Sequence, residues 1–257
     1  MRYIRLLVIF YRYSLLKELE YRVAFFSNVF MSLFWMAWSI FGATIFFQHR
    51  DHLGDWNYNQ VLMVIGLFAM FTGVIEAFFR PNVSAIIEQI RDGTFDFVLT
   101  KPVNAQFFAS LRTIVFWRLF DILAGLIVIG YALNQMNITP TLAQIGAFIV
   151  LLICATVMTY SIWMIMVTFA FWFIKVDNLT ELFWSLYDAA RFPISVYQGW
   201  LRAFLTFVIP LAFITTFPAS ALLGREETNL LPIGVLIAAI LFFASNRFWT
   251  SGVKASA

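Results

Sequence analysis

The sequence has few charged residues. Only 12% of its 257 residues are Asp, Glu, Lys or Arg, whereas 62% are hydrophobic. A soluble domain of this size needs more charged side chains to cover its surface. The apolar runs are about twenty residues long, which is the length of membrane-spanning helices rather than of the short alternating strands of a barrel. The composition therefore predicts an all-α integral membrane protein.

Residues that could carry chemistry are also scarce. Cys154 is the only cysteine, so the chain cannot form an internal disulfide, and its apolar surroundings argue against a metal site. His49 and His52 have no third ligand nearby, and we interpret them as incidental rather than metal-binding. The sequence contains no GxxxxGK(S/T), HExxH, CxxC or GxSxG motif. We therefore expect no catalytic, cofactor-binding or metal-binding residue here, and any ATP must be bound by a partner.

Residues 1–22 have the pattern of an amphipathic helix. If the segment is helical, its charged side chains fall within roughly 140° of arc, opposite a continuous apolar stripe. This pattern is typical of a helix that lies in the membrane interface with its basic face towards lipid headgroups. The alternative is an ordinary basic flank of the first span. The charged face consists of Arg2, Arg5, Arg12, Lys17 and Glu20, and the apolar stripe of Ile4, Leu7, Val8, Tyr11 and Leu15.

Six spans are predicted, at residues 23–47, 61–79, 109–133, 142–174, 179–197 and 231–249. The fifth has a competing interpretation. Hydropathy alone favours 201–223 as the fifth span and leaves the preceding residues as a loop. The other interpretation keeps 179–197 and makes 198–224 a re-entrant hairpin, broken at Pro210 and Pro218. Both interpretations give six spans with both termini on the same side.

The basic residues are distributed unequally between the two sides. With the N-terminus in the cytoplasm and a hairpin before the last span, twelve lie on the inner side and three on the outer side, which agrees with the positive-inside rule. They form no single patch and the net charge is only +3, so we expect no nucleic-acid partner. The inner residues are Arg2, Arg5, Arg12, Lys17, Arg22, Arg80, Arg91, Lys101, Arg112, Lys175, Arg247 and Lys254, and the outer residues are Arg50, Arg202 and Arg225.

Ionisable groups inside predicted spans are candidates for function. Arg118 and Asp121 are three residues apart on one predicted helix face, and so are Asp188 and Arg191. We interpret each as a self-neutralising intramembrane ion pair that fixes helix packing. A substrate or proton role is the alternative, although a proton-driven carrier would normally need an unpaired carboxylate at mid-span.

Residues 86–107 form the longest mixed polar segment between two strongly apolar ones. Its parts are a helix-like start, a turn at Asp92-Gly93, an amphipathic piece over 94–100 and a break at Lys101-Pro102. In the amphipathic piece, Phe95, Val98 and Leu99 can share one helical face. Such an apolar surface suits either insertion into a groove on another protein or contact with lipid, and periodicity alone favours neither.

The sequence RDGTFDFVLTKPVNAQF in this segment resembles the stretch after the second span in permeases of the type-2 ABC exporter family. In that family a charged residue precedes Gly-Thr, an apolar run follows, and Pro-Val comes before the third span. The resemblance implies that the segment is the coupling helix, which docks on a separate ATP-binding subunit. The residues expected at this contact are Arg91, Asp92, Gly93, Thr94, Phe95, Asp96, Phe97, Val98, Leu99, Lys101 and Pro102.

A second match lies in residues 193–224. Trp200-Leu201 and Pro210-Leu211 are similar to the family's Pro-Trp-Leu and apolar-Pro-Leu stretches, which form a re-entrant hairpin on the outer side. The resemblance therefore favours the hairpin interpretation of 198–224. Gly199 stands where the family often has proline. The N-terminal amphipathic segment is similar to the elbow helix of the same family.

The resemblance, closest to a small bacterial branch of the family, implies a half-transporter. Two six-span permeases, identical or paralogous, would pair with two ATPase subunits that bind ATP and Mg²⁺, in the inner membrane and with cytoplasmic termini. The aromatic-rich spans suit export of an amphipathic or lipid-like substrate. The alternative is a stand-alone ion-coupled carrier, in which the candidate residues for the coupling-ion site would be Glu76, Arg118 and Asp121. A membrane-embedded enzyme would need a His/Asp/Glu/Ser cluster that the sequence does not show.

Overall fold

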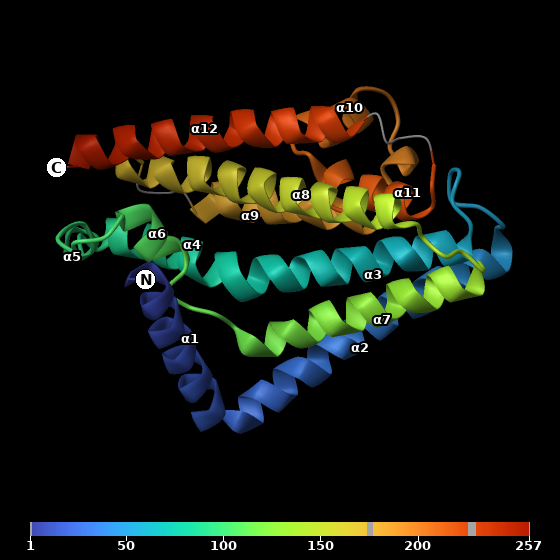
Figure 1. Cartoon of the computed structure of the whole chain (residues 1–257), viewed down its shortest axis with the longest axis horizontal. Helices are drawn as coiled ribbons and strands as arrows, with labels where there is room; N and C mark the ends of the chain where they lie inside the picture. The colour runs from blue at the N-terminus through green and yellow to red at the C-terminus, as the bar shows by residue number, and fades with distance from the viewer. Residues whose placement is uncertain (1, 174–176, 226–229, 257) are drawn as a thin grey trace.

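A computed structural model describes residues 2–173, 177–225 and 230–256, and these residues form an all-helical bundle without strands (Figure 1). Five described helical stretches are long and apolar enough to cross a membrane, namely Arg22–His49, Tyr58–Arg91, Phe116–Gln135, Leu142–Phe171 and Leu231–Lys254. A bent pair of shorter helices, Gly199–Phe207 and Leu211–Leu222, makes a sixth if it is counted as one span. The chain is therefore a multi-pass membrane protein.

The helices follow one another with short connections. The α-helices are α1 (Arg2–Glu20), α2 (Arg22–His49), α3 (Tyr58–Val74), α4 (Arg80–Arg91), α5 (Asp96–Leu99), α6 (Ala105–Ser110), α7 (Leu119–Gln135), α8 (Leu142–Thr168), α9 (Asp177–Tyr187), α10 (Gly199–Phe207), α11 (Thr216–Leu222) and α12 (Leu230–Ser256). Short turns of other helix types are η1 (Ile75–Phe79), η2 (Phe116–Arg118), η3 (Phe169–Phe171), η4 (Asp188–Arg191), η5 (Ile194–Val196) and η6 (Leu211–Phe213). Ile174 and Lys175, assigned above to the fourth span and the inner side, lie outside the described residues.

The bundle has two distinct ends. Both termini lie at the same end as α5 and α6, and α1 runs steeply across the bundle axis there (Figure 1). The bent helix pair α10 and α11 and the connection between α2 and α3 lie at the opposite end (Figure 1). The segment predicted to couple to a partner and the bent pair are therefore separated by the length of the long helices.

Glycines allow α3 and α7 to approach closely. A methyl group added at Gly125 of α7 would overlap the carbonyl oxygen of Gly66 on α3. One added at Gly73 would lie 2.8 Å from Ile122 and 3.0 Å from the carbonyl oxygen of Arg118. Small residues at such contacts let two helix backbones approach closely. Inside a membrane the hydrophobic effect does not drive helices together, so close van der Waals packing of this kind commonly holds them. The α3–α7 contact therefore depends on residues without side chains.

A proline interrupts the long helix at the end of α3. Pro81 has no N–H to donate to the carbonyl of Ala77 four residues earlier, and the π-helical turn η1 comes just before it. The Ala77 carbonyl instead accepts a hydrogen bond from the Val115 N–H at 3.0 Å. The buried Asn82 side chain donates to the Thr113 carbonyl at 2.7 Å and accepts from its N–H at 2.8 Å. The non-helical segment before Phe116 is thus bonded to this helix through one backbone carbonyl and one side-chain amide.

This segment corrects the predicted third span at 109–133. The long helix begins at Phe116, because α6 ends at Ser110 and the residues between them are not helical. Their backbone groups find partners in Asn82 and in the carbonyl that Pro81 leaves free, so they do not need helical bonds. Arg112 therefore lies outside the spanning helix.

Helix α1 caps the start of this third long helix. The Glu18 carboxylate accepts hydrogen bonds from the backbone N–H groups of Phe116 at 2.8 Å and Trp117 at 3.3 Å. A carboxylate at a helix N-terminus satisfies free N–H groups and complements the helix dipole. Burial raises the pKa of the Glu18 carboxyl, and these two hydrogen bonds oppose the rise. Aromatic contacts of Tyr3 with Phe107, at 4.8 Å between ring centroids, hold the other end of α1 on α6.

A continuous helix over 179–197 is not found. The α-helix α9 ends at Tyr187, and only short 3₁₀ turns follow. Phe192 is extended (φ −110°, ψ 149°) because a residue that precedes proline, here Pro193, is pushed out of the helical region. The predicted fifth span is therefore a short amphipathic helix followed by irregular chain.

The segment predicted as a re-entrant hairpin contains α10 and α11, which are bent by 65° relative to each other. Gly199 starts α10 with a φ of +58°, a backbone conformation that proline cannot adopt. Trp200 is 77% exposed, whereas Pro218 and every other residue of α11 are buried against the bundle. Pro210 lies between the two helices and accepts the Phe213 N–H at 3.1 Å.

We predict that Gly125→Ala separates α3 from α7 and lowers stability by about 1–3 kcal/mol, as overpacking of a filled contact does. Gly130 lies on the same helix with open space around it, so Gly130→Ala is the matched control. Because alanine favours helix over glycine, the control should be neutral or more stable by about 0.5–1 kcal/mol. Thermal unfolding of the detergent-purified chain measures both. Equal stability of the two variants would contradict the close contact.

Candidate functional site

An ionic network lies between α3 and α7. Arg118 contacts the carboxylates of both Glu76 and Asp121, with a distance of 2.9 Å to Asp121. Glu76 also pairs with Arg80 at 2.9 Å. Ser32 of α2 donates a hydrogen bond to the other oxygen of Asp121. The network therefore joins three long helices through four charged side chains and one hydroxyl.

Three of the four charges of this network are largely removed from solvent, whereas the Arg80 side chain is 43% exposed. The side chains of Glu76 and Asp121 are 13% and 8% exposed, and that of Arg118 is 21% exposed. Two tryptophans support the cations: Arg118 lies 4.0 Å from the ring centre of Trp117, and Arg80 lies 4.3 Å from that of Trp184. Two carboxylates and two guanidinium groups balance, so the network carries no net formal charge.

The network forms one wall of a cavity of about 750 Å³. Other lining residues are aromatic, with Trp35 and Trp38 of α2 and Phe68 of α3. Asp188 and Arg191 lie at its edge and pair with each other at 3.3 Å, with side chains 62% and 48% exposed. The cavity therefore combines an aromatic surface with a buried charged one, which suits a molecule that has both an apolar and a polar part.

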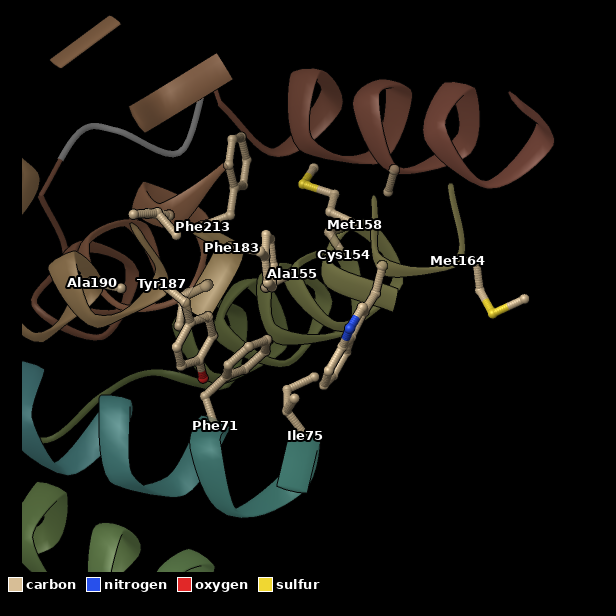
Figure 2. Close-up of a cluster of buried hydrophobic side chains, with 14 of the residues drawn as sticks. Phe71, Ile75, Cys154, Ala155, Met158, Met164, Phe183, Tyr187, Ala190 and Phe213 are labelled. Carbon is tan, nitrogen blue, oxygen red and sulfur yellow. The ribbon is translucent and has the colours of Figure 1, made fainter. Parts of the chain in front are cut away.

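Tyr187 connects this cavity to the hydrophobic core. Figure 2 shows its ring among Phe71, Phe183 and Ala190, with its hydroxyl turned towards α3. The hydroxyl forms a hydrogen bond of 3.0 Å with Thr72, which also lines the cavity. The buried tyrosine thus fixes α9 against α3 at the level of the ionic network.

The sequence indicated part of this site. Arg118 and Asp121 were expected to neutralise each other, and the structure shows that Glu76 shares Arg118 with Asp121. Ser32 and Tyr187 were not expected, because each comes from a different helix and nothing in the local sequence pattern places it beside the network. Only the packing of α2 and α9 on α3 brings these hydroxyls to the cavity.

The segment predicted as a coupling helix forms a short exposed turn at one end of the bundle (Figure 1). Helix α4 ends at Arg91, the chain reverses at Gly93 with a φ of +68°, and α5 follows. The N–H groups of Thr94 and Phe95 both donate to the carbonyl of Gln89, at 2.9 and 3.0 Å. The turn is thus fixed on the end of α4 by backbone hydrogen bonds.

The exposed face of this turn differs from the predicted one. Phe95 is 3% exposed and Val98 is 6% exposed, so they belong to the chain's own core and are not free to enter a partner. Phe95 packs against Phe171 and Trp249, with ring centroids 5.9 and 5.7 Å away, and this contact outweighs the local helical pattern. Leu99 is half-buried.

Phe97 is the large apolar side chain that the turn presents, at 71% exposure. Most of the other predicted coupling residues are exposed around it, namely Arg91, Asp92, Gly93, Thr94, Asp96, Lys101 and Pro102. Arg91 and Asp92 pair with each other at 3.6 Å. The turn therefore offers one aromatic ring within a rim of polar and charged groups, which is the usual arrangement of a small protein contact.

A comparison with protein families matches residues 33–255 to the family described as ABC-2 family transporter protein. The match spans most of the chain and includes the exposed turn and every cavity-lining residue except Ser32. The chain belongs to the ABC-2 transporter family. It is a permease, the multi-pass membrane subunit of an ABC transporter, and permeases of this family associate with an ABC ATPase and typically have no ATP-binding motif of their own. Searches of curated proteins and of solved structures each found no match.

We predict that Arg118→Met lowers stability by about 3–5 kcal/mol, because it leaves the carboxylates of Glu76 and Asp121 buried without their shared cation. Arg191→Met is the matched control, since its pair with Asp188 is exposed and such pairs contribute about 0–1 kcal/mol. Thermal unfolding in detergent compares the two substitutions. A loss as small for Arg118→Met as for Arg191→Met would show that the network does not hold the helices together.

Proposed function

We propose that this permease exports an amphipathic or lipid-like substrate from the cytoplasm or the inner leaflet, as one of two permeases bound to two ATPase subunits. The observation that carries the substrate class is the cavity of about 750 Å³, which is lined both by aromatic side chains and by the ionic network. An apolar tail would lie against Trp35 and Trp38, and a polar head against the charged wall.

A second permease, identical or paralogous, would cover the open side of this cavity. Helix α2 has no buried residue, and the two tryptophans that line the cavity, Trp35 and Trp38, are 59% and 57% exposed. Other large aromatic side chains continue along the same helix, with Phe34 at 46% and Phe41 at 53% exposure. Such a row suits contact with a partner helix or with lipid, and the cavity beside it favours a partner that closes a shared substrate path.

The exposed turn at α5 would transmit the motion of the ATPase. ATP and Mg²⁺ would be bound in the ATPase, and closure of the two ATPases would push on α5 and, through Phe95, on α8 and α12. This path is short, because Phe171 follows α8 in the chain and Trp249 belongs to α12. The buried ring of Phe95 therefore links the exposed turn at α5 to two long helices.

We propose that α1, α5 and both termini face the cytoplasm of the inner membrane. This orientation is supported by the positive-inside distribution of basic residues. It also agrees with the bundle, since the termini and α5 share one end and the hairpin with Arg202 lies at the other (Figure 1). The hairpin of α10 and α11 would then close the substrate path on the outer side.

The docking role of Phe97 gives a direct test. We predict that Phe97→Asp weakens ATPase binding about thirtyfold or more, because aromatic anchors at protein contacts typically contribute 2 kcal/mol or more. The permease itself should keep its thermal stability, because the side chain is exposed. The measurements are co-purification with the ATPase and ATP hydrolysis in reconstituted vesicles.

Two controls make this test specific. Trp200→Asp is a matched change of an exposed aromatic at the opposite end of the bundle, and it should leave ATPase binding intact. Phe95→Ala should instead destabilise the permease by about 3–5 kcal/mol, because it removes a buried ring. If ATPase binding and ATP hydrolysis survive Phe97→Asp unchanged, then α5 is not the coupling contact.

A further inference from the structure

Two neighbouring cavities, of about 450 and 490 Å³, lie between α1 and the region from α4 to α6. They share Ile9 of α1 and Phe108 of α6 as common lining. We call the two cavities together the basic groove. The groove lies beside the exposed turn at α5, because Val98 lines one cavity and Lys101 lines the other.

The basic groove carries positive charge from two parts of the chain. Arg5 and Lys101 line the first cavity, and Lys17 and Arg112 line the second. No Asp or Glu is among the lining residues of either cavity, and within the described ranges none of these four cations pairs with a carboxylate. Four exposed cations without a counter-charge attract anions.

The remaining lining of the basic groove is largely apolar. Leu6 and Ile9 of α1 face Val103 and Phe108 across the first cavity. The guanidinium of Arg112 lies 5.9 Å from the Phe108 ring centre, so a cation and an apolar surface adjoin each other. An inorganic anion would contact only the cations of the groove. An amphipathic anion would contact the cations with its head and the apolar lining with its tail.

The outer face of α1 places this groove at the membrane surface. Ile4, Val8 and Leu19 are between 56% and 69% exposed and lie on one side of the helix. The opposite side of α1 lines the basic groove with Leu6, Ile9 and Lys17. An exposed apolar face beside a basic one is the pattern of a helix in the lipid headgroup region.

We propose that the basic groove binds an anionic phospholipid of the inner leaflet. Its phosphate lies between the cations of α1 and those of Lys101 and Arg112, and its acyl chains run along Ile9 and Phe108. This proposal rests on the cytoplasmic placement of α1 proposed above. A bound lipid would join α1 to the exposed turn at α5, so the lipid composition of the membrane would influence ATPase coupling.

Removal of two cations from the groove tests this proposal. Lys17→Gln/Arg112→Gln should bind phosphatidylglycerol about thirtyfold more weakly than the wild type, since each cation near an anionic lipid contributes about a fivefold change. Arg247→Gln/Lys254→Gln removes the same charge from exposed sites of α12 outside the groove and should change little. Native mass spectrometry of the full-length chain, delipidated and titrated with phosphatidylglycerol, measures the affinity.

Further arms of the experiment separate the groove from a general charge effect. The conservative pair Lys17→Arg/Arg112→Lys should retain binding, which shows that a loss in the glutamine pair does not come from misfolding. Phosphatidylcholine should bind weakly to all variants, and millimolar inorganic phosphate should not displace phosphatidylglycerol. Equal lipid affinity of the glutamine pair and the α12 control would overturn the proposal. Release of the ATPase with unchanged lipid binding would overturn it as well and would assign the groove to an acidic segment of that partner.

Discussion

Arg118 holds two carboxylates from two different helices in a largely desolvated place, and the arrangement of the first half of the bundle depends on this contact. The cation would be costly to bury alone, and so would Glu76 and Asp121, so each group requires the others. Arg118 can reach the Glu76 carboxylate because Gly73, which has no side chain, lets α3 come within van der Waals distance of the turn that carries Arg118. The same close approach gives the cavity its charged lining, so stability and the proposed substrate binding share one set of residues.

A second constraint acts at the end of the bundle where α1 and α5 lie. Pro81 frees the carbonyl of Ala77, and the chain uses that carbonyl and the Asn82 side chain to bind a non-helical segment. This segment precedes the helix that carries Arg118, and Glu18 of α1 caps the start of that helix. The N-terminal helix, the proline break and the ionic network are therefore connected through backbone hydrogen bonds. A displacement of α1 or α4 would reach the cavity by this route, which gives the proposed coupling a physical path.

Much of the fold could be predicted from hydropathy, because long apolar runs such as 142–168 have few alternatives to a spanning helix. The errors lie where tertiary contacts override a local pattern. Residues 111–115 are apolar enough to extend the third helix, yet Asn82 offers their backbone other partners. Phe95 has the spacing of a surface anchor, yet Phe171 and Trp249, far away in sequence, surround it. Ser32 and Tyr187 could not be assigned to the site, since no short-range spacing relates them to Arg118.

The account rests on the claim that this chain works only as part of an ATP-driven complex. The most direct measurement is the intact mass of the complex purified in mild detergent from the native host, followed by identification of each chain. We expect a mass equal to two permeases, each of 29.7 kDa if identical, and two ABC ATPases, with ATP hydrolysis that depends on the ATPase chain. A chain that stays without an ATPase in several detergents, and that transports in vesicles without ATP, would contradict the account.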